Sequence, residues 1–153
     1  MITNLPYRKN VAVFVLNEEG KILACRRSDH LGWQLPQGGV DDNETLEQAM
    51  YREVGEEIGT VEVKLLGNLE EPIRYEWPEH LHQRGFRGQE QYYFLVRLEP
   101  GAELDLQKDA HPEFDAVQWL SAEEFNGCLA GFKAEAYSCA LSRLQRKYPG
   151  IIT

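Results

Sequence analysis

Apolar residues along the chain fall into short blocks, and their spacing predicts strands and helices in mixed order. Residues 11–16 are apolar and rich in β-branched side chains, which is typical of a strand buried on both faces. Residues 17–20 favour a turn, so residues 21–26 are expected to return as the partner strand of a hairpin. Further strand patterns cover residues 61–69, 91–98 and 116–120.

Helix signals occur in three stretches, which are residues 46–58, a short segment that begins after Ser121, and residues 133–147. Thr45 and Gln48 form a capping-box pattern before the first of these helices, and Gly59 is a natural stop signal after it. Two connecting segments are expected to be irregular. They are residues 28–39, which contain a proline and adjacent glycines, and a long loop over residues 72–88.

The mixture of elements predicts the fold class. Strands and helices alternate without strict βαβ order, so we expect an α/β (α+β) fold with a mixed β-sheet and helices packed on it. A chain of 153 residues provides enough material for one hydrophobic core but not for two. The sequence therefore predicts a single domain over residues 1–153.

Composition excludes several classes of function. The chain has 16 Lys and Arg against 25 Asp and Glu, a formal net charge of −9. This balance argues against a protein that binds duplex nucleic acid by bulk charge. The longest apolar run is far too short for a membrane span, and we expect no membrane partner and no secretory signal. Three cysteines without a CxxC pair predict reduced thiols and a cytoplasmic location.

The first predicted helix carries its acids in an unusual place. At about 100° per residue, the apolar residues within about 80° of Leu46 are Ala49, Met50 and Val54. Three carboxylates fall within the same range, those of Glu53, Glu56 and Glu57. A solvated acidic face, the usual meaning of a charge run, would lie opposite the apolar stripe.

This placement creates an electrostatic conflict. Glu53 and Glu57 are like charges one turn apart, and acids near a helix C-terminus oppose the helix dipole. Arg52, one turn before Glu56, offsets only part of this repulsion. A hard divalent cation such as Mg²⁺ removes the conflict, because it takes one or two carboxylates and shares its other positions with water and phosphate oxygens.

The spacing from Gly38-Gly39 to the acids resembles a known motif. The fixed positions of the Nudix box, G-x5-E-x7-R-E-U-x-E-E-x-G-U, are matched by Gly38, Glu44, Arg52, Glu53, Val54, Glu56, Glu57 and Gly59. Only Thr60 departs, where an aliphatic residue is usual. The chain is therefore similar to Nudix hydrolases, with the box over residues 38–60, and the resemblance implies the Nudix fold with its catalytic loop-helix-loop.

Other segments resemble one branch of this family. It holds the bacterial RNA pyrophosphohydrolases and the plant-type dinucleoside tetraphosphate hydrolases. The similar segments lie at residues 7–11, 33–39, 48–53, 112–114 and 132–133. Lys9 stands where the RNA enzymes usually have proline and resembles the plant-type sequences. Ala134 stands where arginine is usual in the last helix, so the choice between the two substrates stays open.

The resemblance implies roles for individual residues. Glu53, Glu56 and Glu57 would bind catalytic cations, with the Gly38 carbonyl as a further ligand. Glu44 and Arg52 would pair and orient the loop and helix, and Glu113 would approach the metals from across the site. Groups expected to touch the substrate are Arg8, Arg27 and Lys133 on the phosphates, Phe132 with Arg27 on a base, and Tyr75 from the long loop.

These residues predict a metal-dependent pyrophosphohydrolase that uses two or more Mg²⁺ or Mn²⁺ ions. Either Glu53 or Glu113 would act as general base. The expected substrate is a nucleoside 5′-polyphosphate, either an RNA 5′ end or a dinucleoside polyphosphate, and the expected state is a monomer or weak homodimer. Alternatives are a nucleotide-binding module of the same fold with weak turnover, a calcium-buffering acidic helix, and a metal site at His80 and His82.

Overall fold

The computed structural model describes residues 4–153, except for the side chains of Leu81, Gln83 and Arg84, so residues 1–3 of the predicted domain lie outside the described residues. The strands are β1 (Tyr7–Leu16), β2 (Ile22–Arg27), β3 (Trp33–Gln34), β4 (Gln37–Gly39), β5 (Val63–Asn68), β6 (Ile73–Glu76), β7 (Gly88–Leu98) and β8 (Phe114–Leu120). The helices are α1 (Leu46–Ile58), the 3-10 helix η1 (Glu79–Arg84), α2 (Ala122–Cys128) and α3 (Ala134–Lys147).

A mixed sheet forms the centre of the described chain, as the sequence predicted. Strands β1 and β7 run parallel through its middle, from Tyr7 opposite Gly88 to Leu16 opposite Arg97. The other strands pair antiparallel: β2 and β4 with β1, β5 and β6 with β7, and β3 and β8 with β2. This arrangement confirms the predicted α+β class.

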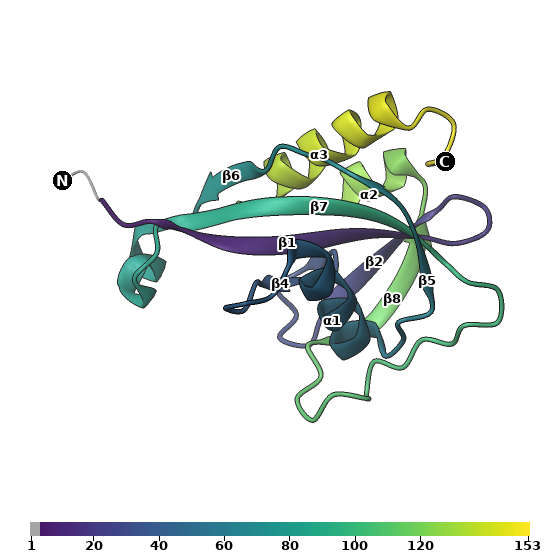
Figure 1. The fold of residues 1–153 in the computed structure, drawn as a ribbon, viewed down its shortest axis with the longest axis horizontal. Helices are drawn as coiled ribbons and strands as arrows, with labels where there is room; N and C mark the ends of the chain where they lie inside the picture. Colours follow the sequence, from purple (N-terminus) through teal and green to yellow (C-terminus); the bar gives the residue numbers. More distant parts are fainter. Residues whose placement is uncertain (1–3) are drawn as a thin grey trace.

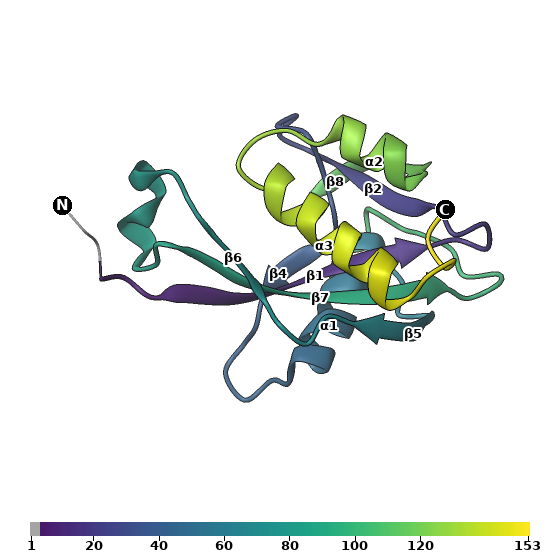
Figure 2. The same cartoon turned by 90° about the horizontal axis from the view of Figure 1, so that it is seen from above.

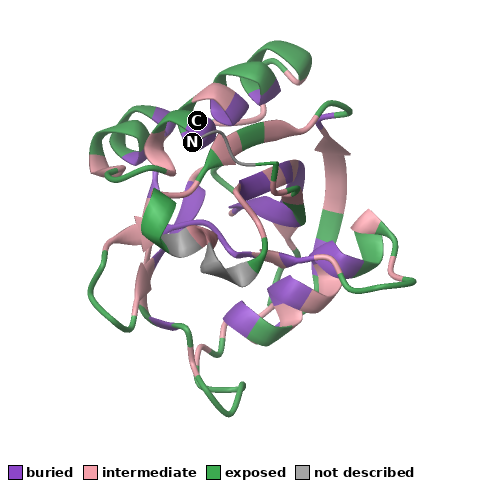
Figure 3. Ribbon diagram, turned by 90° about the vertical axis from the view of Figure 1, so that its left-hand side faces the viewer, coloured by how far each residue is buried: buried purple, intermediate pink, exposed green. Residues whose placement is uncertain are grey.

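Helices cover both faces of the sheet (Figure 1), with α1 on one side and α2 and α3 on the other. Along β1, alternate residues enter two separate cores. Val11, Val13 and Val15 pack in the core under α1, whereas Ala12, Phe14 and Leu16 pack in the core under α2 and α3. All six are fully buried, which confirms that residues 11–16 form a strand buried on both faces. Figure 3 shows buried residues concentrated in the sheet and on the inner sides of the helices.

The expectation of a long loop over residues 72–88 is wrong. β6 pairs with β7, with Tyr75 opposite Gln89, and η1 connects the two strands into an arm that projects beyond the helices (Figure 2). Ion pairs Arg74–Glu90 and Arg87–Glu76 link the two strands. The alternation of Ile73 and Tyr75 with charged residues was a strand signal, but the prolines at both ends of the segment masked it.

Residues 28–39 also contain more regular structure than expected, because β3 and β4 are short strands of two and three residues. β4 has an important place, since it pairs antiparallel with β1 beside the N-terminal half of that strand. No helix in residues 4–153 combines the length and the apolar character needed to cross a bilayer. The three cysteines are free thiols.

Candidate functional site

Helix α1 begins and ends where its capping residues predict. The Thr45 hydroxyl accepts a hydrogen bond from Gln48 N at 3.1 Å, and Gln48 Oε1 accepts one from Thr45 N at 2.9 Å, which completes the capping box. Gly59 ends the helix with a φ of 78°, a left-handed conformation that favours glycine. These caps fix which face of α1 meets the sheet.

Of the three neighbouring acids in the second half of α1, two are buried and one is exposed. Glu53 and Glu57 are buried, at 8% and 5% exposure, and they continue the apolar stripe as predicted. Glu56 does not, because its side chain is 49% exposed and lies 3.5 Å from the Arg52 guanidinium. Glu56 lies near the edge of the stripe, at about −80° from Leu46, so a modest outward turn brings it to solvent and to its i−4 cation.

Strand β4 brings Gly38 and Gly39 against two charged side chains. A Cβ on Gly38 would lie 2.1 Å from the carboxyl carbon of Glu53, so only glycine fits there. A Cβ on Gly39 would lie 2.1 Å from the Arg8 guanidinium. The two glycines therefore allow the main chain of β4 to lie directly against an acid of α1 on one side and a predicted phosphate-binding arginine on the other.

Arg52 ties the loop before α1 to the helix. Its guanidinium donates two hydrogen bonds to the Glu44 carboxylate, at 2.7 and 2.9 Å, and a third to the Gly39 carbonyl oxygen at 2.8 Å. It also donates to Glu53 at 2.6 Å. The hydrogen bonds from Arg52 lower the pKa of Glu44 to about 2. The structure thus places Glu44 and Arg52 in the pairing role that the resemblance implies.

Glu57 has one satisfied and one unsatisfied carboxylate oxygen. Its Oε1 accepts a hydrogen bond from Gln37 N at 2.9 Å, whereas its buried Oε2 has no hydrogen-bond partner. Burial, reinforced by the negative charges of Glu113 and Glu53, raises the pKa of Glu57 well above its ordinary value. Burial also raises the pKa of Glu53, although Arg52 opposes the effect.

This donor set fits a hard divalent cation. A buried carboxylate oxygen without a partner is costly, and carboxylate and carbonyl oxygens are the ligands that Mg²⁺ and Mn²⁺ prefer. Glu53, Glu57 and the Gly38 main chain meet at one place and supply such oxygens.

The remaining predicted ligands do not join this group directly. Within residues 4–153, no three His, Cys, Asp or Glu side chains converge into a ready set of metal ligands. Glu56 faces Arg52, and Glu113 is exposed in the segment that precedes β8. His80 and His82 belong to no such group either, and the His82 ring contacts the Trp77 carbonyl oxygen at 3.0 Å.

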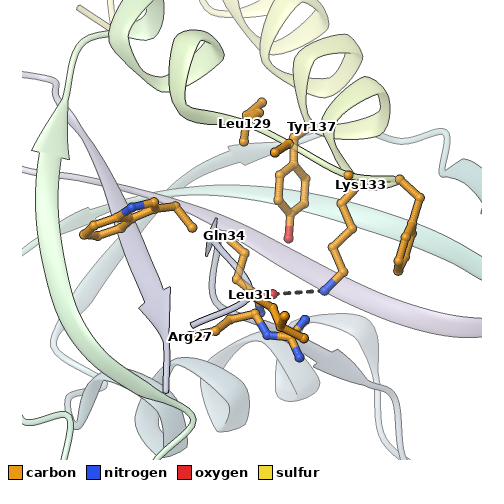
Figure 4. A pocket seen from close by; sticks show the side chains of 10 residues that line it. Arg27, Leu31, Gln34, Leu129, Lys133 and Tyr137 are labelled. Carbon is orange, nitrogen blue, oxygen red and sulfur yellow. Dashed lines mark hydrogen bonds between the residues drawn. The ribbon is translucent and has the colours of Figure 1, made fainter. Parts of the chain in front are cut away.

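Beside the acids lies a pocket of about 140 Å³ that we call the base pocket (Figure 4). Its lining residues are Arg27, Leu31, Trp33, Gln34, Leu129, Ala130, Gly131, Phe132, Lys133 and Tyr137. Lys133 donates to Gln34 Oε1 at 3.0 Å, and burial followed by the nearby Arg27 lowers the pKa of Lys133 to about 8. Glu113 and Glu57 act electrostatically on the same ammonium group, so the base pocket adjoins the acids.

Two aromatic rings stand at the edge of the base pocket. Phe132 is 43% exposed, and its ring centroid is 6.1 Å from that of Tyr75 on β6. The Tyr75 hydroxyl accepts from Gln89 Nε2 at 2.9 Å, and burial raises the pKa of Tyr75 to about 12. Arg27 pairs with Asp29 at the end of β2. The structure therefore brings Arg27, Tyr75, Phe132 and Lys133 together, while Arg8 lies apart, against Gly39.

Sequence reasoning missed a set of buried polar residues behind the site. These are Asn10, Gln34, Gln37, Gln89 and Gln91, none of them more than 8% exposed, together with the hydroxyls of Tyr93 and Tyr137. A signal was present in the sequence. Gln89 and Gln91 alternate along β7 and so share one face of that strand, and Gln34 and Gln37 flank the apolar pair Leu35-Pro36.

Comparisons with known proteins agree with this geometry. The NUDIX domain profile matches residues 6–139. The RNA pyrophosphohydrolase of Caulobacter vibrioides is 38% identical over 148 residues, which cover 91% of this chain and 86% of that protein. The dihydroneopterin triphosphate pyrophosphohydrolase of E. coli shares the fold with a TM-score of 0.73 at 21% identity, covering 93% of this chain and 99% of that one. A C. elegans Ap4A hydrolase complex has a TM-score of 0.68 at 19% identity, with coverage of 92% and 99%.

The match to the family profile spans most of the chain and includes β4, α1 and the base pocket. The acids, the paired glycines and the Arg52–Glu44 pair stand at the positions of the Nudix box. The chain therefore belongs to the Nudix family.

Proposed function

We propose that this protein is a cation-dependent pyrophosphohydrolase that removes phosphate groups from the 5′ end of RNA. Its family and its relatives make it a hydrolase of phosphoanhydride bonds in nucleotide polyphosphates. RNA is the favoured substrate because the curated relative at 38% identity, covering 91% of this chain, is an RNA pyrophosphohydrolase. A second candidate, a dinucleoside polyphosphate, is favoured by Lys9, which resembles the plant-type enzymes.

One observation carries the proposal. Glu57 keeps a buried carboxylate oxygen without a partner, next to Glu53 and the Gly38 main chain, in a region that adjoins the base pocket. A buried acid site with an unsatisfied carboxylate oxygen, beside an aromatic and cationic pocket, matches a substrate that brings divalent cations, phosphates and a base together. A structural acidic helix would need none of the pocket residues, and a calcium buffer would not need Phe132 or Lys133.

Different residues of the chain would bind the cations, the phosphates and the base. Glu53 and Glu57, joined by Glu56 and the Gly38 carbonyl, would hold two or more Mg²⁺ or Mn²⁺ ions. When bound, these ions acidify a water molecule and stabilise charge on the leaving phosphate. Arg8, Arg27 and Lys133 neutralise the outer phosphates, while Phe132 offers an exposed ring face for a base and Tyr75 supports that ring from β6.

Two carboxylates are candidates for the general base. Glu53 is hydrogen-bonded to Arg52 at 2.6 Å, which favours its charged form. Glu113 is exposed and free to approach a bound water molecule from the other side of the site. The conservative variants Glu53→Gln and Glu113→Gln distinguish them, because loss of the base removes the acidic limb of the pH–rate profile.

A substrate panel with Mg²⁺ and Mn²⁺ tests the proposed function. The panel contains triphosphate-ended RNA, diphosphate-ended RNA, diadenosine tetraphosphate, free nucleotides and nucleotide sugars. We expect kcat/KM to be highest for one of the RNA ends. A higher value for diadenosine tetraphosphate would favour the second candidate. Absence of turnover on every substrate, with nucleotide binding retained, would leave a binding module of the same fold.

The cysteines and the exposed apolar side chains bear on location and assembly. We propose a cytoplasmic protein, because its three cysteines are free thiols. We also propose a monomer or weak homodimer. The large apolar side chains left exposed in the described chain, Leu31, Val61 and Phe132, are scattered over separate elements.

A further inference from the structure

A line of buried polar side chains runs from the base pocket to α1. Tyr137, which lines the pocket, donates its hydroxyl hydrogen bond to Gln37 Oε1. The side chain of Gln91 contacts the same oxygen at 3.3 Å and donates to Asn10 Oδ1 at 2.6 Å. The main-chain N–H of Gln37 donates in turn to Glu57 Oε1 at 2.9 Å. A single residue, Gln37, therefore separates the wall of the base pocket from a carboxylate of the acid helix.

Because this line of polar side chains is buried, it costs free energy to form and allows one arrangement of hydrogen-bond partners. Asn10, Gln91 and Tyr137 are at most 1% exposed, and Gln37 is 8% exposed. Buried polar groups of this kind are costly unless each finds a hydrogen-bond partner, so the partners restrict one another to a single arrangement. The Tyr93 hydroxyl extends the line by donating to Gln91 Oε1. Apolar side chains would fill the same space at a lower cost in free energy.

The main chain of strand β4 is held by β1 and, at Gly39, by the Arg52 guanidinium. The strand is three residues long and pairs only with β1 among the described strands, with Gln37 opposite Ala12. Its glycines contribute no side chains. Gln37 therefore supplies the one side chain of β4, which reaches Tyr137 on the α3 side of the sheet, while its N–H faces Glu57 on the α1 side. In Figure 4 the Tyr137 hydroxyl points from α3 down toward the sheet.

We infer that Gln37 and Tyr137 are positioning residues for the cation site. Tyr137, together with Gln91 and Tyr75, holds the Gln37 side chain. The Gln37 N–H then holds Glu57 Oε1, so that Oε2, which has no partner, is aimed at the place where a cation binds. This inference rests on the proposed function, in which Glu57 is a cation ligand. It extends that function by making one wall of the base pocket part of the support for the metal site.

The test compares two tyrosine variants with the same chemical change. Tyr137→Phe removes one buried hydroxyl and keeps the ring. Tyr148→Phe is the matched control at the far end of α3. The part-buried Tyr148 hydroxyl accepts from Asn68 N at 3.1 Å and donates to the Asn68 carbonyl oxygen at 3.2 Å, away from Gln37. Mn²⁺ affinity is measured without substrate, by the electron paramagnetic resonance signal of free Mn²⁺, alongside the melting temperature, kcat and KM.

We expect Tyr137→Phe to weaken Mn²⁺ binding about tenfold, the size of effect typical of groups that orient a metal ligand. Its kcat at fixed Mg²⁺ should fall, while KM at saturating Mg²⁺ stays within about twofold of wild type, because the removed hydroxyl faces Gln37 and the ring that lines the base pocket is kept. Tyr148→Phe should lower the melting temperature to a similar degree and leave Mn²⁺ affinity and kcat unchanged. Gln37→Ala should act in the same direction as Tyr137→Phe and more strongly.

Two results separate failure of this inference from failure of the proposed function. If Tyr137→Phe binds Mn²⁺ like wild type while Glu57→Gln loses binding, Glu57 is a ligand but the positioning role is wrong. If Glu57→Gln itself binds Mn²⁺ like wild type, the proposed cation site is wrong and the inference falls with it. Should Gln37→Ala fail to fold, Tyr137→Phe decides the question alone.

Discussion

The acid helix and the base pocket adjoin each other but are built in opposite ways. The acid site comes from one continuous segment, residues 37–60, in which the three-residue strand β4, a loop and α1 follow directly in the chain. The base pocket is assembled from the end of β2, from β3 and the loop before it, from the segment between α2 and α3, and from Tyr137 of α3, with Tyr75 of β6 beside it. One region is local in sequence, and the other depends on the whole fold.

The two regions also differ in how far their polar groups are satisfied. In the base pocket, Lys133 donates to Gln34, and the adjoining Tyr75 hydroxyl accepts from Gln89. In the acid site, Glu57 retains a buried oxygen without a partner, and burial disfavours its charged form. The Lys133 ammonium group therefore has a protein partner without a ligand, whereas Glu57 needs a proton or a cation. Beside the pocket, the buried Gln89 Oε1 also has no partner. Variants in the two regions should fail in different ways.

The largest effect is expected from Glu57→Gln. Turnover should be nearly abolished, because the variant keeps the shape of the side chain but loses its charge toward cations. Without metal, the variant should be at least as stable as wild type. A gain of about 0.3 kcal/mol in the free energy of unfolding is expected, because a like-charge contact with Glu53 is removed. Steady-state kinetics and denaturant unfolding without metal measure the two quantities.

The exposed Glu47 in the first turn of α1 provides the matched control, since Glu47→Gln removes a charge from the same helix away from the site. It should leave kcat unchanged. A Glu57→Gln variant that keeps more than about a tenth of the wild-type kcat, a loss below about 1.4 kcal/mol, would mean that this carboxylate is not central.

The second effect is stabilisation by metal. A cation that binds only the folded protein at about 100 times its Kd contributes about 2.7 kcal/mol, which for a domain of this size raises Tm by about 5–10 °C. We expect this rise in the wild type and its absence in the Glu53→Gln/Glu56→Gln/Glu57→Gln triple variant, measured by calorimetry with and without Mg²⁺. An equal rise in the triple variant would place the ions elsewhere in the protein.

The same contrast explains how much the sequence could predict. The caps Thr45 and Gly59, the helix between them and the burial of Glu53 and Glu57 follow from local spacing, because helix geometry fixes which side chains share a face. The exposure of the Glu56 side chain and its contact with Arg52 depend on side-chain packing, which an angle count at the edge of the stripe does not report.

Non-local features were harder to foresee. The polar line through Gln37, Gln91 and Tyr137 joins residues 54 and 100 positions apart, and no periodicity reports such a distance. The arm of β6 and η1 was missed because two prolines outweighed a four-residue alternation. The family motif supplied Phe132 and Lys133, but only the fold shows that they share a pocket with Arg27.

A third prediction separates stacking from charge in the base pocket. Phe132→Ala should weaken substrates that carry a base by about 1–3 kcal/mol, the usual value of base–aromatic stacking, and spare any small polyphosphate that the enzyme accepts. Lys133→Ala should weaken both kinds of substrate and give a shallower salt dependence than wild type. Kinetics on the two substrates at several salt concentrations make the comparison.

Phe125 is the control for packing, because it is fully buried, whereas Phe132 is 43% exposed. Phe125→Ala should cost about 3–5 kcal/mol of stability, as expected for a buried ring, and Phe132→Ala much less. A Phe132→Ala variant that is as unstable as Phe125→Ala, and equally poor on every substrate, would assign Phe132 to the core.

The smallest effect concerns pH, and it moves substrate binding and stability in opposite directions. The pKa of Lys133 is lowered to about 8, so the free enzyme loses this positive charge as the pH rises through about 8. The value of kcat/KM, which reports groups of the free enzyme, should therefore fall at alkaline pH by up to about fivefold, the size of a partly solvated ion contact. Stability follows the reverse course, because the unfolded chain binds this proton more tightly than the folded one, so folding is penalised as the pH falls from about 10 toward 8.

Lys133→Ala should flatten both profiles, while Lys64→Ala, which removes an exposed lysine of β5, should change neither. An alkaline limb that persists unchanged in Lys133→Ala would assign the titration to another group and leave Lys133 as a contact without a role in the pH dependence.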